Sequence, residues 1–93
     1  MSFYVYIIKT ISSKINKTYV GYTNNLKKRL NLHNKSLGAK FTKGRLWKLA
    51  YYKIFNSKSI ALKEEYKLKK NYILRTKIKK KFIKNENICS SSI

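Results

Sequence analysis

The sequence is poor in acidic residues, with three Asp or Glu residues against 23 Lys or Arg residues among 93. It contains no aspartate, and its three carboxylate side chains belong to Glu64, Glu65 and Glu86. A two-metal hydrolase needs several carboxylates that converge on a pair of ions, and this chain can hardly supply them. If the chain hydrolyses phosphodiesters with a metal, we expect one ion and one protein carboxylate.

Cysteine and long apolar runs are also scarce. Cys89 is the single cysteine, so it can form no internal disulfide and can build no zinc site by itself. No apolar run reaches the length of about 18 residues that a membrane span needs. We therefore expect a cytoplasmic protein, associated with the nucleoid if it is bacterial, with neither a membrane nor a disulfide-linked partner.

The formal net charge of +20 is the strongest compositional feature. A folded chain with so much self-repulsion usually meets a polyanion, most often nucleic acid. The abundance of Lys, Ile, Asn and Tyr is also the bias expected of an AT-rich genome, which remains a competing explanation. An anionic membrane is less favoured, because no long helix sets an apolar face opposite a basic one. We expect nucleic acid as the partner, DNA rather than RNA.

Runs of β-branched and aromatic residues predict three strands, and helical periodicity after N-cap candidates predicts three helices. The strands are predicted at residues 3–9, 18–22 and 47–55, and the helices at 26–34, 58–72 and 75–84. The fold class is therefore α+β, a three-stranded antiparallel sheet flanked by helices. Residues 1–84 are predicted to form one domain, and residues 85–93 a flexible C-terminal tail.

Glu65 is the carboxylate with the most informative position. Helical spacing places one stripe of the second helix at Ala61, Glu65, Leu68 and Tyr72, whereas Glu64 is predicted to face solvent. A carboxylate on an apolar stripe needs a cation. That cation is either a lysine of this basic chain or a divalent metal that Glu65 shares with water and phosphate oxygens.

The first helix carries the only histidine of the chain. Its inner stripe is predicted at Leu26, Leu30 and Leu37, and Arg29 and His33 lie four residues apart beside it. Arginine presents a planar fork to two phosphate oxygens, and histidine can transfer a proton near neutral pH. Taken alone, His33 is better explained as a capping or surface histidine.

The predicted hairpin supplies tyrosines and a glycine. Tyr4 and Tyr6 share one face of the first strand, and Tyr19 lies two residues before Gly21 in the second. Several of the eight tyrosines must simply fill strands. A glycine within a strand often allows the close approach of a ligand. A lysine-rich site with a nearby metal would lower the pKa of a tyrosine toward the neutral range that a base requires.

These residues resemble the paired signature of the GIY-YIG nucleases, with Tyr4-Val5-Tyr6 in the first strand and Tyr19-Val20-Gly21 in the second. The resemblance covers roughly residues 3–80. The segments 19–34, 38–45 and 61–70 are similar to the small standalone branch of the family, which is found mostly in bacteria.

The resemblance implies a role for each matching residue. Tyr19 would be the base that activates water, and Tyr6 would help to position that water or the phosphate. Arg29 would stabilise charge on the phosphoryl oxygens, and His33 would assist substrate binding or proton transfer. Glu65 would hold one Mg²⁺ or Mn²⁺ ion. The implied activity is metal-dependent hydrolysis of nucleic acid by an endonuclease or related phosphodiesterase, in DNA repair or recombination.

The chain departs from the family at two positions. Tyr4 stands where many relatives have glycine. Many relatives also carry an Asn beyond the helix of the glutamate, where this chain reaches Thr76, Lys77 and Ile78, and Asn71 is the nearest Asn. An alternative function is therefore a non-catalytic basic protein, bound to RNA or the ribosome, that retains the fold. A lysine-rich scaffold without a nucleic-acid role is a third possibility.

The nucleic-acid contacts are predicted in the basic loop between the first helix and the third strand and at its edge. The predicted contact residues are Lys35, Lys40, Thr42, Lys43, Arg45 and Lys48. The run from Lys77 to Lys81 is a second candidate, although a merely solvated helix face explains it about as well. Neither segment is suited to reading bases, so we expect a preference for nucleic-acid structure over sequence.

Overall fold

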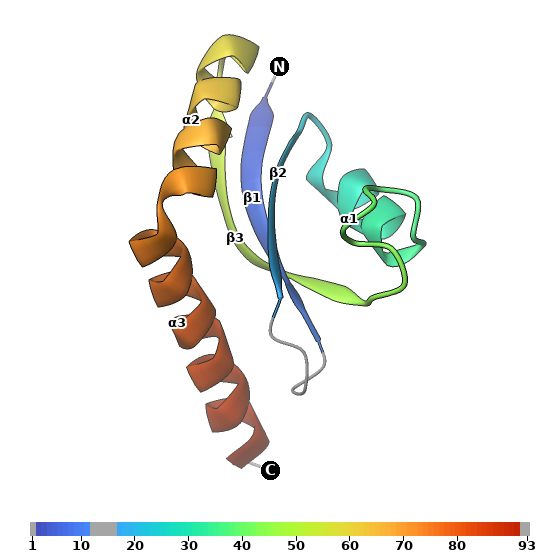
Figure 1. The fold of residues 1–93 in the computed structure, drawn as a ribbon, viewed down its shortest axis with the longest axis vertical. Coiled ribbons are helices and arrows are strands. Elements are labelled where there is room, and N and C mark those ends of the chain that lie inside the picture. The colour runs from blue at the N-terminus through green and yellow to red at the C-terminus, as the bar shows by residue number, and fades with distance from the viewer. Residues whose placement is uncertain (1, 12–16, 92–93) are drawn as a thin grey trace.

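The computed structural model describes the backbone of residues 2–11 and 17–91, and the side chains of residues 2–11 and 17–81. The elements, in chain order, are β1 (Phe3–Thr10), β2 (Thr18–Thr23), α1 (Leu26–Asn34), β3 (Trp47–Phe55), α2 (Lys58–Lys70) and α3 (Tyr72–Ser91). Figure 1 shows α1 on one side of the sheet, and α2 and α3 on the other. The predicted α+β class is confirmed.

The sheet has the strand order β2-β1-β3, and β1 pairs antiparallel with both neighbours. Tyr6 of β1 lies between two partners, Gly21 of β2 and Tyr52 of β3. Residues Val5–Thr10 of β1 are all buried, because this central strand is covered on both faces. This explains why β1 reads as a nearly continuous apolar run rather than an alternating one.

The sheet separates two apolar clusters, since successive side chains of a strand point to opposite faces. Beneath α2, the buried members are Val5, Ile7, Val20, Ala61 and Leu68. Beneath α1, they are Tyr6, Ile8 and Trp47, with Tyr19, Leu26 and Leu30 packed against them. The Tyr6 side chain thus belongs to the face that α1 covers.

Each of the first two helices begins at an N-cap side chain. The side chain of Asn25 accepts a hydrogen bond from the Lys28 amide at 3.1 Å, and that of Ser57 accepts one from the Ile60 amide at 3.5 Å. At the other end of α1, Asn34 accepts from the Trp47 amide at 2.6 Å and donates to the Trp47 carbonyl at 3.1 Å. These last two bonds fix α1 to the start of β3, so the helix cannot shift along the sheet.

Two predicted apolar positions are wrong, because backbone breaks occur where helical periodicity was extended. Asn71 leaves the helical conformation (φ −88°, ψ 78°) and caps the next helix, since its Oδ1 accepts from the Leu74 amide at 3.0 Å. Tyr72 therefore starts α3 and is 71 % exposed. Leu37 lies beyond α1, after Ser36 with its positive φ of 63°, and is also 71 % exposed.

The third helix is longer than predicted at both ends and reaches Ser91. The backbone of residues 85–91 is thus helical, and the division between a domain over residues 1–84 and a tail over 85–93 stays a prediction. Within the described ranges, no helix combines the length and the apolar composition that crossing a membrane demands.

Candidate active site

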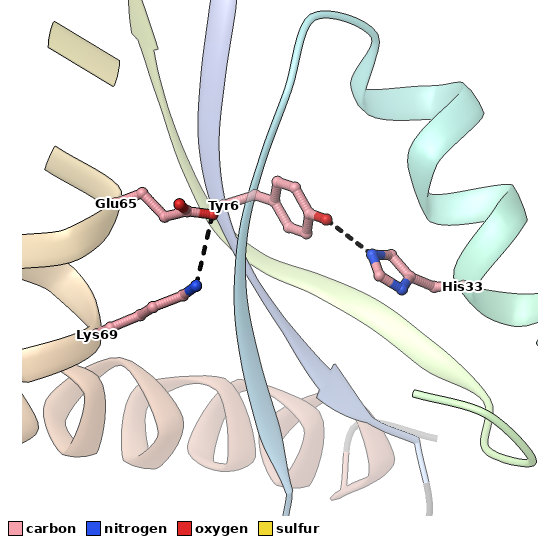
Figure 2. Close-up of polar contacts among 4 residues, drawn as sticks. All are labelled: Tyr6, His33, Glu65 and Lys69. Atoms are coloured by element: carbon pink, nitrogen blue, oxygen red, sulfur yellow. Dashed lines mark hydrogen bonds and ion pairs between the residues drawn. The ribbon is translucent and has the colours of Figure 1, made fainter. Parts of the chain in front are cut away.

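A buried chain of hydrogen bonds links β1, α1 and the loop before β3. The Tyr6 hydroxyl lies 2.7 Å from Nε2 of His33, and Nδ1 of His33 lies 2.9 Å from Oγ1 of Thr42. The three residues are 1 %, 0 % and 0 % exposed, respectively. Figure 2 shows the Tyr6 ring extending from the sheet toward His33 on α1. His33 is therefore neither a capping nor a surface histidine.

The contacts of Thr42 indicate the direction of these bonds. Its hydroxyl has one proton, which it donates to the Ala39 carbonyl at 3.0 Å. Toward His33 it must then accept, which puts the ring proton on Nδ1. Nε2 is left with its lone pair and accepts from the Tyr6 hydroxyl. These hydrogen bonds thus form a neutral relay, in which Tyr6 donates to His33 and His33 donates to Thr42.

Two glycines make room for the rings of this relay. A Cβ on Gly21 would lie 2.3 Å from the Tyr6 hydroxyl oxygen, and one on Gly38 would lie 2.4 Å from Nδ1 of His33. Any side chain at either position would force the ring beside it to move. Gly21 thus admits a side chain of the site itself, rather than the ligand that the sequence suggested.

Arg29 is the cation beside this relay. Its guanidinium donates to the Gly38 carbonyl at 3.2 Å, while its Nε is buried and has no hydrogen-bond partner among the described residues. Buried polar groups are normally satisfied, so an unpartnered donor suits a site that receives an anionic ligand. The predicted proximity of Arg29 and His33 is present.

The surroundings shift two pKa values in the site. Burial raises the pKa of Tyr6 to about 12, although hydrogen bonding and charge from Arg29 lower it; Tyr19 and Glu65 add smaller increases. Burial, with a contribution from the Arg29 charge, lowers the pKa of His33 to about 4. At neutral pH Tyr6 is therefore a protonated donor and His33 an uncharged acceptor, as the hydrogen bonds also require.

Tyr19 lies at the boundary between this buried relay and solvent. It is partly exposed, and its ring meets His33 edge-on with 5.1 Å between centroids. On the other side, Phe41 stacks on Tyr19 at 6.2 Å and 21°. The ring of Phe41 is in turn covered by the Arg45 guanidinium at 5.6 Å. Phe41 was missed as a site residue because its contact with Tyr19 depends on how the loop folds.

Glu65 approaches from α2 and is largely covered, with its side chain 19 % exposed. Its charge makes the smallest contribution to the raised pKa of Tyr6. It forms an ion pair with Lys69, whose Nζ lies 3.8 Å from Oε2 (Figure 2). Glu64 is more exposed, at 39 %, and pairs with Lys67. As predicted, Glu65 is more covered than Glu64. A lysine partner for Glu65, the predicted alternative to a metal, is also present.

The donor set fits only a metal that keeps most of its own water. Among the described residues, no three His, Cys, Asp or Glu side chains come together. Glu65 offers one carboxylate, whose ion pair with the half-exposed Lys69 is loose. A hard ion such as Mg²⁺ is commonly bound through one or two carboxylates, with water and substrate phosphate completing its shell. The residues present fit such an ion.

The residues predicted to contact nucleic acid fall into two groups. Lys35, Lys40, Lys43 and Lys48 are exposed, and Arg45 is partly exposed. The prediction that Thr42 contacts nucleic acid is wrong, because its hydroxyl is buried against His33 and the backbone of Ala39, where it cannot meet a phosphate. Its role in the structure is to hold the His33 ring.

Asn71 lies outside this cluster. It caps α3 and lines a cavity on the α2 side of the sheet, opposite the face that carries Tyr6. The position of the family's Asn is therefore not filled by Asn71.

Comparison with known proteins agrees with this geometry. A family model described as the GIY-YIG catalytic domain matches residues 2–83. The chain belongs to the GIY-YIG family. The resemblance inferred from the two tyrosine motifs is thus confirmed, and the family match places the chain in a nuclease superfamily that acts on nucleic acid and in general depends on a divalent metal.

Bacterial members of this family are similar over most of the chain. A UPF0213 protein of Clostridium perfringens is 46 % identical over 88 residues, covering 90 % of both chains. One of Oceanobacillus iheyensis is 45 % identical over 67 residues, covering 71 % of this chain and 74 % of the relative. The solution NMR structure of a UPF0213 protein from Bacillus halodurans is 32 % identical, covers 83 % of this chain and 80 % of that chain, and has a TM-score of 0.48.

Proposed function

We propose that this GIY-YIG protein hydrolyses phosphodiester bonds of nucleic acid, DNA in preference to RNA, with one divalent metal ion. The observation that carries the proposal is the buried Tyr6–His33–Thr42 relay, with three partly exposed groups of complementary chemistry on the elements around it. These are a phenol (Tyr19), a guanidinium (Arg29) and a carboxylate (Glu65). DNA repair and recombination are the contexts in which we place this activity.

Tyr19 is the proposed base. Its hydroxyl, once ionised, would accept a proton from the water that attacks phosphorus in line with the leaving oxygen. Tyr6 is poorly suited to this step, because burial raises its pKa to about 12. Tyr6 and His33 are instead positioning residues, since both are buried and His33 meets the Tyr19 ring edge-on.

Arg29 is the proposed stabiliser of phosphoryl charge. Only part of its hydrogen-bonding capacity is used within the protein, and the buried Nε is unpartnered among the described residues. A guanidinium held in place before the substrate arrives stabilises the growing charge without reorganising. The other two arginines have different surroundings, since Arg45 covers the ring of Phe41 and Arg75 belongs to α3.

Glu65 is the proposed metal ligand, and Mg²⁺ or Mn²⁺ are the ions that its carboxylate suits. When bound, the ion would offset negative charge on the leaving oxygen. Binding would displace Lys69, which is half exposed and whose Nζ lies 3.8 Å from Oε2 of Glu65. A long ion pair with a solvent-exposed lysine contributes little stability, so its displacement costs little.

The test is cleavage of branched, single-stranded and duplex DNA and RNA by purified protein in Mg²⁺, Mn²⁺ or EDTA. Glu65→Ala and Tyr19→Phe should abolish metal-dependent cleavage and leave DNA binding within a few-fold. Two matched controls should retain cleavage: Glu64→Ala, the neighbouring acid on α2, and Tyr22→Phe, which lies on the opposite face of β2. Undiminished cleavage by Glu65→Ala would contradict the proposal.

The alternative is a non-catalytic nucleic-acid binder. Two observations support it: Glu65 already pairs with Lys69, and Asn71 does not fill the position of the family's Asn. It predicts salt-sensitive binding of DNA or RNA with no metal-dependent products. The same experiment therefore separates the two functions.

A further inference from the structure

Beside the relay, an open groove of about 660 Å³ runs between the start of α1 and strands β1 and β3. Its apolar lining consists of Tyr4, Leu26, Leu30, Leu49, Tyr52 and Ile54. The groove continues the face that carries the site, because Tyr4 is two residues from Tyr6 on the same strand and Tyr52 is the β3 partner of Tyr6. It is used by none of the steps proposed above.

Aromatic and aliphatic side chains in the groove remain partly exposed to solvent. Tyr52 and Ile54 are each 50 % exposed, and the rings of Tyr4 and Tyr52 lie 6.2 Å apart at 56°. Two tyrosines and an isoleucine left open on a small domain are unusual unless something covers them. Aromatic faces in such a position can stack with the flat face of a nucleobase, which needs no particular base identity.

The rim of the groove is polar and basic. Asn24 and Lys27 line it and are exposed, and Lys28 is exposed beside them on α1. Among the residues whose side chains are described, no carboxylate lines it, since Glu64 and Glu65 belong to α2, on the other side of the sheet from α1 (Figure 1). An apolar floor beside a polar rim that carries Lys27 matches a strand whose base turns inward and whose phosphate meets a lysine.

The charge of the chain argues against a second copy of this protein as the occupant. Two chains of net charge +20 repel each other. A nucleic-acid strand removes this repulsion and covers the exposed rings at the same time.

We infer that this groove binds one unpaired nucleobase of the substrate strand, next to the phosphodiester that is cut, by stacking on Tyr52 and Tyr4. The inference rests on the proposed function. A base inside a duplex is already stacked and paired, so the groove favours substrates with an unpaired nucleotide beside the cut. Stacking would give this preference without base-specific hydrogen bonds.

The test compares two single-stranded oligonucleotides of equal length in EDTA, one of thymidylate and one abasic, so that both carry the same phosphates. Wild-type protein should bind the thymidylate strand about 5-fold or more tightly than the abasic strand. Tyr52→Ala should remove that difference, and Tyr52→Phe, which keeps the ring, should retain it. Thermal melting of each variant shows whether the fold is intact.

Tyr66→Ala is the matched control, because Tyr66 is 60 % exposed and lies on α2, across the sheet. It should leave the preference for the thymidylate strand unchanged. Equal binding of the two strands by wild-type protein that still cleaves DNA would overturn the nucleobase groove alone. Absence of all nucleic-acid binding would overturn the proposed function with it. A dimer by light scattering that Tyr52→Ala dissociates would also overturn the inference and assign the groove to a second copy.

Discussion

At the residue scale, His33 has the most informative environment, because it is fully buried and is the only side chain of the sequence whose ordinary pKa lies near neutrality. Its neutral form is needed to accept the hydrogen bond from Tyr6, and burial, with a smaller contribution from the Arg29 charge, favours that form by lowering the pKa of His33. Helical spacing alone placed His33 beside Arg29. The partner hydroxyls come from β1 and a loop, far away in the sequence, so only the family resemblance assigned it to the site.

This environment makes stability depend on pH. The pKa of His33 is about 4 in the folded state against 6.5 as the ordinary value, so the unfolded chain binds a proton first as pH falls. The contribution of His33 to the free energy of unfolding should therefore be fully present well above pH 6.5 and fall by about 3 kcal/mol as the pH falls to about 4. Urea unfolding at several pH values measures this.

The control is His33→Gln, which removes the only histidine of the chain. Between about pH 5 and 7, where carboxylates of ordinary pKa stay ionised, this variant should unfold with a nearly constant free energy. If wild-type and variant show the same dependence over this interval, His33 is not held neutral.

Gly21 is the second residue whose environment makes a sharp prediction. Alanine there would put its Cβ 2.3 Å from the Tyr6 hydroxyl, so the ring must leave His33 or β2 must bend. We expect Gly21→Ala to destabilise the fold by roughly 1–3 kcal/mol, the usual range for overpacking, and to reduce cleavage strongly. Calorimetric melting and a cleavage assay measure the two effects.

Gly44→Ala is the control, because a Cβ at Gly44 would meet no atom within 4 Å. This variant should lose only the stability that an L-residue loses at a φ of 78°, and its cleavage activity should be unchanged.

At the element scale, the regular structure was predicted closely and the loop before β3 was not. α1 and β3 match their predicted bounds because N-caps and β-branched runs are local signals. The loop folds through contacts that have no periodicity. Examples are Leu37 donating to the Leu32 carbonyl at 2.8 Å and the Trp47 indole donating to the Thr42 carbonyl at 3.0 Å. These contacts place Thr42 and Phe41 in the site, which spacing could not predict.

The loop should therefore affect catalysis through Thr42. Thr42→Val keeps the shape of the side chain but removes the acceptor for Nδ1 of His33, leaving a buried N–H unpaired. Such a loss costs about 1–3 kcal/mol. We expect turnover to fall several-fold more than substrate affinity, because the basic side chains of the loop remain in place. Thr42→Ser, which keeps the hydroxyl, should behave like wild type in both measurements. A variant whose affinity falls as much as its turnover would show that the loop as a whole had moved.

At the scale of the whole molecule, the charge of +20 does not by itself say which surface meets nucleic acid. Two lysine groups were predicted from the sequence, and the fold separates them. Figure 1 shows the loop after α1 on one side of the sheet and α3 on the other. Since Arg29, His33 and Tyr6 lie on the α1 face, a substrate bound at the site meets the loop first.

This separation predicts different salt dependences for two matched triple variants. Lys35, Lys40 and Lys43 of the loop are exposed, and so are Lys77, Lys80 and Lys81 of α3. Each variant replaces three lysines with glutamine, so both lower the net charge equally. Duplex binding in EDTA, measured over a range of KCl concentrations, gives a slope of log K against log [KCl] that reports phosphate contacts. The slope of the loop variant should be smaller by about 0.9 for each phosphate contact removed. The α3 variant should keep the wild-type slope, because salt at 0.1 M screens the attraction of its distant lysines within about 10 Å. A larger loss of slope in the α3 variant would place the nucleic acid on the opposite side of the sheet, away from the relay.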